Sequence, residues 1–438
     1  MDKRDSISAE RAVLLDINFL KLISSAALAN FVQPIFTLFL SLLAVNLGAS
    51  VFEIGLIGGA SYVVYSFMPF VMGRFSDRGQ ARKFFIILSL ALLATVSILY
   101  SLSENPIDLI VLRLAEGLGW AAFWPSIDSA VSHDTQVDPK RALAVFNLSW
   151  SFAAALGPLV GSFVVVIFSI RQVFIFNAVF LLLAFSLNLI PYSKFRRSRK
   201  IGNSISGEKE TAIRETRISE SVESAIVESN MPDNPNGTGL KKVSPLFYVV
   251  SLALCALTFS TIASFFSPYA RSQGLTIVVI GAISLTFGAA RFFGYLLTSN
   301  VWVSNFLLDR KIRSRNIFAL LFLLVLSSLL MVLHSTSGLI YFLSFGLVGF
   351  AYSLVYYVGM VALLAETSKE KMGAGAGIFE TSIGMGSLAG PVIAGAVAGN
   401  SLTLPFIVPS FCAIPTLVAL FLLWRSGTNQ KSMTSGRI

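Results

Sequence analysis

Residues 73–83 read GRFSDRGQARK, and this stretch decides how the chain is laid out. It is short and charged, and it separates two long apolar runs, 54–72 and 84–102. Each run has the length of a helix that crosses the hydrocarbon core of a bilayer. So short a link between two such helices must be a tight hairpin at one membrane face. Its excess of Lys and Arg predicts that this face is cytoplasmic.

The composition of the whole chain agrees with a membrane protein. Of its 438 residues 55% are hydrophobic and 13% are charged, with a mean hydropathy of +0.76. A soluble protein carries about 25% charged residues. The formal net charge of +10 is not a nucleic-acid signal, because the basic residues sort into the links between apolar runs and report topology.

Twelve apolar segments of spanning length follow one another and form two sets of six. They predict an all-α membrane protein with twelve transmembrane helices in two pseudo-symmetric halves, 1–193 and 245–438. The polar stretch 194–244 is predicted to be a flexible linker. The predicted segments are 19–46, 52–73, 83–103, 107–131, 141–167, 171–192, 246–270, 277–302, 315–334, 338–365, 373–398 and 403–425.

The distribution of basic residues predicts the orientation of these segments. With the N-terminus in the cytoplasm, nearly all of the 33 Lys and Arg lie on the cytoplasmic side. The exceptions are Arg171 and Arg271 outside, and Arg113 and Arg291 within spans. We therefore expect a multi-pass protein of the plasma membrane, with both termini and the linker in the cytoplasm.

The two sets of segments look like copies of one unit. Aromatic, polar, Gly and Pro residues of the fifth segment recur at the same spacing in the eleventh. The residues that correspond are Phe146, Asn147, Gly157, Pro158 and Gly161 in the fifth segment, and Phe379, Glu380, Gly390, Pro391 and Gly395 in the eleventh. Such a repeat is typical of transporters whose halves rock about a central site.

Three motifs resemble those of the major facilitator superfamily. Gly73, Asp77 and Arg78 are similar to the family's Gly-x-x-x-Asp-Arg-x-Gly-Arg-Arg loop, although the following Gly and basic pair are displaced by one place. Arg113-Leu-Ala-Glu116-Gly-Leu-Gly is similar to Arg-x-x-Gln-Gly-x-Gly, with Glu where Gln is usual. The helix-packing Gly-Pro motifs are Gly157, Pro158 and Gly161 in the fifth segment and Gly386, Gly390 and Pro391 in the eleventh.

The resemblance implies a cytoplasmic latch. In the family the Asp of the loop docks on the N-terminus of the eleventh helix, where a carboxylate gains roughly 0.3–2 kcal/mol. By resemblance Asp77 meets the amides near Gly373, and Asp128, at the cytoplasmic end of the fourth segment, is placed to pair with Arg78 or Arg82. The alternative is that these charges only fix topology. The latch residues expected in the two halves are Gly73, Asp77, Arg78, Asp128, Asp309 and Arg310.

Ionisable residues inside the spans are functional candidates, because a charge in lipid costs several kcal/mol. Arg113 and Glu116 share a helix face and can neutralise each other, either as a structural salt bridge or as a proton carrier with its tuning partner. Glu380 stands where its repeat has neutral Asn147, which favours proton or substrate contact. Arg291 either attracts an anionic substrate or braces Glu380 or Asn147.

Aromatic and amide residues predict a mostly apolar cavity. By resemblance the first, fourth, seventh and tenth segments line it, and such a cavity suits a hydrophobic or amphipathic solute. The residues expected at its wall are Asn30, Gln33, Trp124, Trp150, Tyr269, Tyr352 and Tyr356.

These features favour a monomeric secondary transporter that works by alternating access and exports such a solute in exchange for protons. The proton would be carried by Glu116 with Arg113, or by Glu380. Uptake of a sugar or an organic anion, with Arg113 or Arg291 as the anion ligand, is the alternative, and a non-transporting sensor is another. We expect no enzyme activity, metal, cofactor, nucleotide or nucleic acid, because no cluster of catalytic residues and no Walker pattern occurs. The proton gradient is the expected energy source, and a small molecule and the lipid bilayer are the expected partners.

Overall fold

The computed structural model describes residues 16–68, 79–133, 135, 139–190, 245–298, 300–309, 313–333, 338–366 and 372–429. Their secondary structure is helical, with no strand among these residues. The first half contains α2 (Ile17–Asn46), α3 (Val51–Tyr65), α5 (Gly79–Leu102), α6 (Pro106–His133), α7 (Pro139–Ile167) and α8 (Ile170–Leu189). The second contains α10 (Pro245–Ser272), α11 (Ile277–Thr298), α12 (Val301–Leu308), α13 (Arg313–Leu330), α14 (Leu339–Glu366), α15 (Met372–Val397) and α16 (Val408–Asn429), with a 3-10 turn at Leu404–Phe406.

The long helices match the apolar segments of the sequence. In the described part, 8 helices are long and apolar enough to cross a membrane, and α3 and α7 carry shorter apolar stretches. The helical membrane fold is thus confirmed, while a count of twelve spans stays a prediction. The boundaries of the halves at 193 and 245 also stay predictions, because residues 191–244 lie outside the described part.

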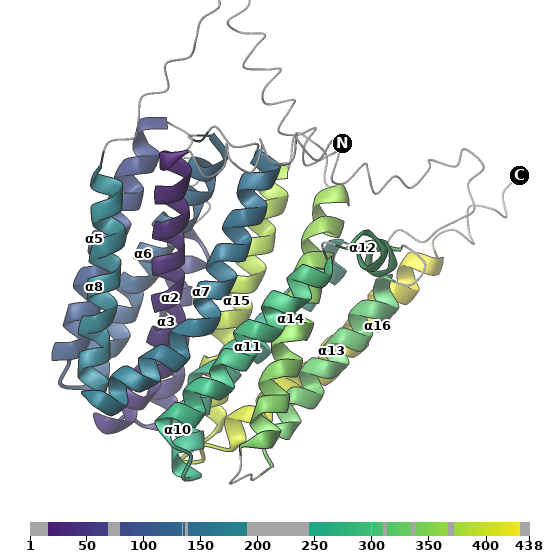
Figure 1. The fold of residues 1–438 in the computed structure, drawn as a ribbon. Coiled ribbons are helices and arrows are strands. Elements are labelled where there is room, and N and C mark those ends of the chain that lie inside the picture. The colour runs from purple at the N-terminus through teal and green to yellow at the C-terminus, as the bar shows by residue number, and fades with distance from the viewer. Residues whose placement is uncertain are drawn as a thin grey trace, which may run out of the picture.

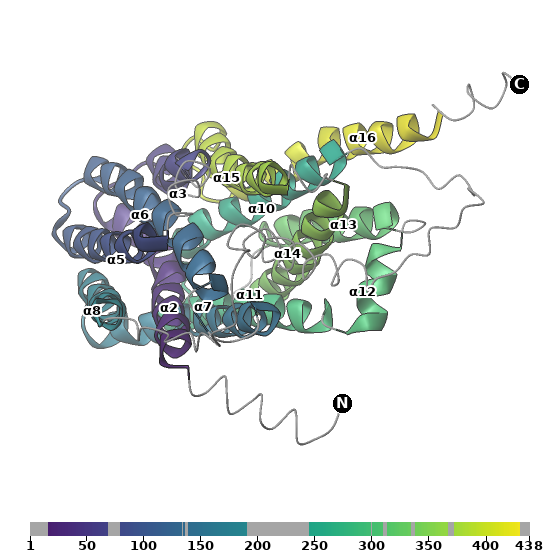
Figure 2. The same ribbon diagram turned by 90° about the horizontal axis from the view of Figure 1, so that it is seen from above.

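The two halves repeat one packing scheme. In the first half α2 packs on α7 and α8, α5 packs on α6 and α8, and α3 packs on α6. In the second half α10 packs on α15 and α16, α13 packs on α14 and α16, and α11 packs on α14. Each pair occupies the same place in its half, which confirms the expected pseudo-symmetry. The halves stand next to each other, purple to blue and green to yellow in Figures 1 and 2.

Small residues line the seams at which the halves meet. The main contacts are α3 on α15 and α7 on α11. A Cβ at Gly55 would collide with the carbonyl oxygen of Pro391, and a Cβ at Gly281 would lie 2.7 Å from that of Pro158. The prolines of both Gly-Pro motifs therefore lie at the seams, where the helix backbones approach closely.

The second half has one short helix that the sequence patterns did not predict. The expected eighth segment, 277–302, ends early, because α11 stops at Thr298 and α12 starts after Asn300. The Asn300 side chain accepts a hydrogen bond from the Trp302 amide over 2.9 Å, which caps the new helix. Figure 1 shows α12 nearly end-on, across the direction of the long helices.

Candidate functional site

A cavity of about 230 Å³ lies between the halves. Four helices of each half form its wall: α2, α3, α6 and α7, and α10, α11, α14 and α15. The remaining long helices stand behind them and contribute none of its lining residues. Both halves thus share one central site, which is the arrangement that relative motion of the halves can open and close.

The cavity wall is rich in aromatic side chains. Its charged residues are Arg113, Glu116 and Arg291. Its aromatic residues are Tyr62, Tyr65, Trp120, Phe259, Phe266, Phe287, Phe345 and Tyr352. A wall with mostly apolar surface and a few polar groups is typical of sites for organic molecules.

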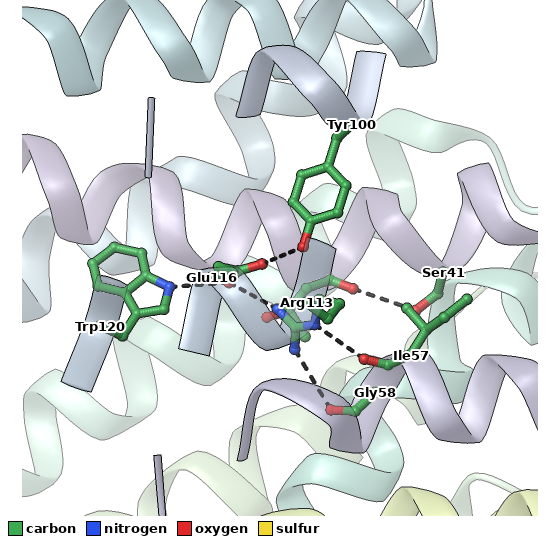
Figure 3. Close-up of polar contacts among 8 residues, drawn as sticks. Ser41, Ile57, Gly58, Tyr100, Arg113, Glu116 and Trp120 are labelled. Atoms are coloured by element: carbon green, nitrogen blue, oxygen red, sulfur yellow. Dashed lines mark hydrogen bonds and ion pairs between the residues drawn. The ribbon is translucent and has the colours of Figure 1, made fainter. Parts of the chain in front are cut away.

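Glu116 is the centre of a polar cluster at this wall (Figure 3). Its carboxylate accepts hydrogen bonds from the Arg113 guanidinium over 2.8 Å, the Tyr100 hydroxyl over 2.8 Å and the Trp120 indole N–H over 2.9 Å. The carboxylate is 2% exposed and Arg113 is 5% exposed. Because the two charges are paired and surrounded by donors, the cluster meets the conditions under which a buried ion pair is tolerated.

Close packing of α3 on α6 places the Arg113 side chain. A Cβ at Gly117 would collide with the carbonyl oxygen of Ser61, so the two backbones touch there. One helical turn earlier, Arg113 donates from Nε to the Ile57 carbonyl oxygen over 3.0 Å and from Nη2 to that of Gly58 over 3.5 Å. The guanidinium is therefore fixed by the backbone of α3 as well as by Glu116.

Glu380 has a different environment. Its Oε2 accepts one hydrogen bond, from the Tyr65 hydroxyl over 3.3 Å, and this bond joins α15 to α3 across the seam. Among the described residues no Lys or Arg forms an ion pair with it. The ring of Tyr356 stands edge-on to Phe379 beside it, with centroids 4.9 Å apart. Asp128 of α6 lies close enough to interact with Glu380 electrostatically.

Arg291 contributes a second positive charge to the cavity wall, on the opposite half from Arg113. Its guanidinium carbon lies 5.4 Å from the centroid of the Phe287 ring, which is within cation–π range. Tyr295, one turn further along α11, is within electrostatic range of both Arg291 and Glu380.

The residues expected at the cavity wall separate into groups. Gln33 and Tyr352 line the cavity, and Trp124 stacks on the lining Trp120 with centroids 6.3 Å apart. Tyr356 stacks on Tyr352 next to Glu380. The side chains of Asn147 and Trp150 are not among those that the structure describes, so their place at the wall stays a prediction.

Two of the expected wall residues lie elsewhere. Asn30 is buried and donates to the Ala26 carbonyl oxygen within α2, over 2.8 Å. Tyr269 is buried between Tyr341 and Phe406. Neither residue lines this cavity, because each has turned to partners in its own half.

Most of the expected latch lies outside the described residues. This holds for Gly73, Asp77, Arg78 and Arg310. Of the remaining latch residues, Asp128 is an exposed residue of α6, and Asp309 ends α12, with its amide bonded to the Asn305 carbonyl oxygen. The latch stays a prediction.

The Gly-Pro residues make the closest contacts within each half as well. A Cβ at Gly157 would collide with the Phe31 carbonyl oxygen of α2, and one at Gly390 with that of Leu257 in α10. Gly161 faces Phe39 of α2, while Gly386 faces the Ala253 backbone of α10. The motif thus lets α7 and α15 approach the corresponding helix of each half.

Sequence patterns predicted Arg113 as a partner of Glu116 but did not predict the other donors to the two carboxylates. Trp120 follows Glu116 by four residues, and this spacing indicates that both side chains lie on the same face of the helix. Tyr100 and Tyr65 belong to other helices than the carboxylates they contact, and no spacing in the chain indicates those pairs.

Two pseudo-symmetric helical halves around one shared cavity define a membrane transporter. The model of the Major Facilitator Superfamily matches residues 22–356 and 249–436, and the chain belongs to this superfamily. The solved structure of the nucleoside transporter NupG has a TM-score of 0.70 at 14% identity, and the match covers 93% of this chain and 99% of that one. At this identity the likeness shows the fold alone.

Curated relatives are distant in sequence. An uncharacterized MFS-type transporter, MJ1317 of Methanocaldococcus jannaschii, is 23% identical over 405 residues, which is 90% of this chain and 91% of the relative. A multi-drug resistance efflux pump PmrA homolog of Lactococcus lactis subsp. lactis is 25% identical over 174 residues. That match spans 39% of this chain and 42% of the relative, less than half of its length. These proteins and the family are transporters, so this chain is a membrane transporter and not an enzyme.

Proposed function

We propose that this transporter exports a hydrophobic or amphipathic small molecule in exchange for protons. The observation that carries the proposal is the shared cavity, whose wall combines many aromatic side chains with an internally neutralised ion pair. Aromatic surface binds apolar solutes with little demand on their shape, and a neutralised pair does not repel them.

Alternating access supplies the mechanism. The halves touch along seams of small residues, so they can rock about the cavity while side chains on either face separate or meet. The efflux pump among the relatives supports export as the direction. In the proposed orientation the protein is a monomer of the plasma membrane with cytoplasmic termini, and Asp77, Arg78 and Asp128 belong to its cytoplasmic latch.

A second candidate is transport of an organic anion. Arg291 contributes a positive charge to the cavity wall, and a carboxylate-bearing solute in the cavity would meet this charge. Its place over the Phe287 ring, beside the stacked pair Phe259 and Phe287, favours an aromatic anion.

Vesicles reconstituted with the purified protein and an imposed pH gradient test both candidates. Ethidium represents amphipathic cations and fluorescein represents aromatic anions. We expect ethidium to move against the proton flow, with the movement abolished by a protonophore and missing in vesicles without protein. Ethidium transport that ignores the gradient would overturn proton coupling. Gradient-driven fluorescein transport alone would favour the second candidate.

A further inference from the structure

We infer that Glu380, held by Tyr65 across the seam, is the residue that binds the coupling proton, and that Glu116 is a fixed structural anion. This inference rests on the proposed proton-coupled transport. It distinguishes between two carboxylates that the sequence leaves equivalent, and it assigns a role to Tyr65, which joins the cavity to the seam.

Glu116 is unsuited to exchanging a proton. Three donors hold its carboxylate, and one of them is the buried Arg113 guanidinium. A proton on Glu116 would leave that guanidinium buried without its counter-charge, which is strongly unfavourable. Moreover, the partners of Glu116 belong to α5 and α6, so the cluster lies wholly within the first half and carries no contact across the seam.

Glu380 has the opposite properties. It is surrounded by groups from four other helices: Tyr65 of α3, Asp128 of α6, Tyr295 of α11 and Tyr356 of α14. One neutral hydroxyl is its hydrogen-bond donor, and the nearby Asp128 carboxylate repels a negative charge. Arg291 lies within electrostatic range of Tyr295, which also faces Glu380. A carboxylate with so little support gives up its charge most readily when a proton arrives.

Proton binding at Glu380 changes the contact between the halves. The carboxylate takes up the proton to become a carboxylic acid, and the Tyr65 hydrogen bond changes from charge-assisted to neutral. Neutral hydrogen bonds are roughly half as strong as charge-assisted ones. Next to this bond, Thr381 donates to the Ser66 carbonyl oxygen over 3.2 Å, so the α3–α15 seam loosens where its few polar contacts lie.

Tyr65 connects this event to the solute. Its side chain lines the cavity and its hydroxyl reaches Glu380. A solute that contacts Tyr65 disturbs the same hydrogen bond that the proton weakens. Solute and proton therefore act on one cross-seam contact, and this is what exchange of one for the other requires.

Infrared titration of the purified protein tests the proton site without any solute. The carbonyl stretch of a protonated carboxyl group should be lost in Glu380→Gln and kept in Glu116→Gln. The matched control is Glu104→Gln, at an exposed carboxylate in the link before α6. We expect Tyr65→Phe to let the carboxyl bind its proton at about tenfold lower proton concentration, because the anion loses its donor. The band surviving in Glu380→Gln would overturn the inference, and Glu380→Asp, which keeps a carboxyl group, should restore the band.

Transport separates failure of the inference from failure of the proposed function. The readout is the ratio of gradient-driven to gradient-free ethidium transport in vesicles. It should fall to one in Glu380→Gln and stay at the wild-type value in Glu104→Gln. Tyr357→Phe, which removes a hydroxyl bonded to Ser304 within the second half, controls for loss of a tyrosine hydroxyl. A wild-type ratio of one would overturn the proposed function, whereas a ratio that persists in Glu380→Gln would overturn the inference alone.

Discussion

The two carboxylates Glu116 and Glu380 differ in how they are held: Glu116 is buried and Glu380 is half-buried. Glu116 receives three hydrogen bonds, one of them from a buried cation, and every partner belongs to its own half. Glu380 receives one longer hydrogen bond from a neutral group on the other half. The comparison teaches that a place within a helix of the bundle does not by itself identify a functional charge. A charge whose partners saturate it stabilises one structure, and a charge with a single partner remains able to respond.

The same contrast separates the pseudo-symmetric halves. Gly117 of α6 touches the Ser61 backbone of α3, and Gly349 of α14 touches the Phe287 backbone of α11 in the corresponding way. Arg113 and Glu116 stand four residues and one residue before Gly117. The corresponding positions before Gly349 are occupied by Phe345 and Val348. One scaffold thus carries a charged cluster in the first half and an apolar cluster in the second.

The largest expected effect comes from removing one charge of the saturated pair. Glu116→Leu leaves Arg113 buried without a counter-charge and should lower the free energy of unfolding by about 3–5 kcal/mol. Thermal unfolding in detergent measures it. The double variant Arg113→Leu with Glu116→Leu is the control, since an apolar pair like that of the second half should recover most of the loss. A double variant as unstable as the single one would contradict the comparison.

An intermediate effect is expected where both halves use the same backbone contact. Gly117→Ala and Gly349→Ala each place a Cβ against a carbonyl oxygen and should each cost about 1–3 kcal/mol. Gly346→Ala is the control on the same helix as Gly349, because its Cβ would meet just Thr286, at 3.7 Å. The melting temperatures of the three variants measure whether Ala costs the same stability at Gly117 and Gly349, and less at Gly346. If one of the two contact glycines tolerates Ala, the packing of the halves is less symmetric than the structure indicates.

The smallest expected effect concerns the responsive carboxylate. Glu380→Gln keeps an acceptor for the Tyr65 hydroxyl and removes the repulsion from Asp128. The free energy of unfolding should therefore change by less than about 0.5 kcal/mol. The same unfolding assay measures it beside Glu116→Leu. A loss as large as that of Glu116→Leu would place Glu380 among the structural charges and remove the contrast.

The sequence predicted the fold well because its signals are local. Apolar runs of spanning length, the charged stretch 73–83 and the recurring Gly-Pro pairs each need a few neighbouring residues to be recognised. These features predicted the helical halves and the resemblance to the family that the comparisons confirm. The helix α12 was not predicted, although Asn300 before an apolar stretch is an N-cap signal, because apolar residues continue on both sides of Asn300.

The site was predicted in part for the same reason. Arg113 and Glu116 share a helix, so their spacing indicated the ion pair that the structure contains. The Tyr100 and Tyr65 contacts join residues 16 and 315 positions apart, and they depend on how helices pack. Asn30 and Tyr269 show the converse, since the sequence predicted them at the cavity wall and the structure places them against partners in their own halves.

The paired prolines of the Gly-Pro motifs have a consequence for what the cavity recognises. Proline has no amide hydrogen, so Pro158 cannot bond to the carbonyl group of Ala154, nor Pro391 to that of Ser387. Ala154 and Ser387 both line the cavity, one from each half. Each half therefore has, at a residue that lines the cavity, one main-chain carbonyl group that lacks its usual helical donor. Side-chain replacement at these two residues leaves the carbonyl groups in place, so a solute that donates hydrogen bonds to them would escape notice in an alanine scan.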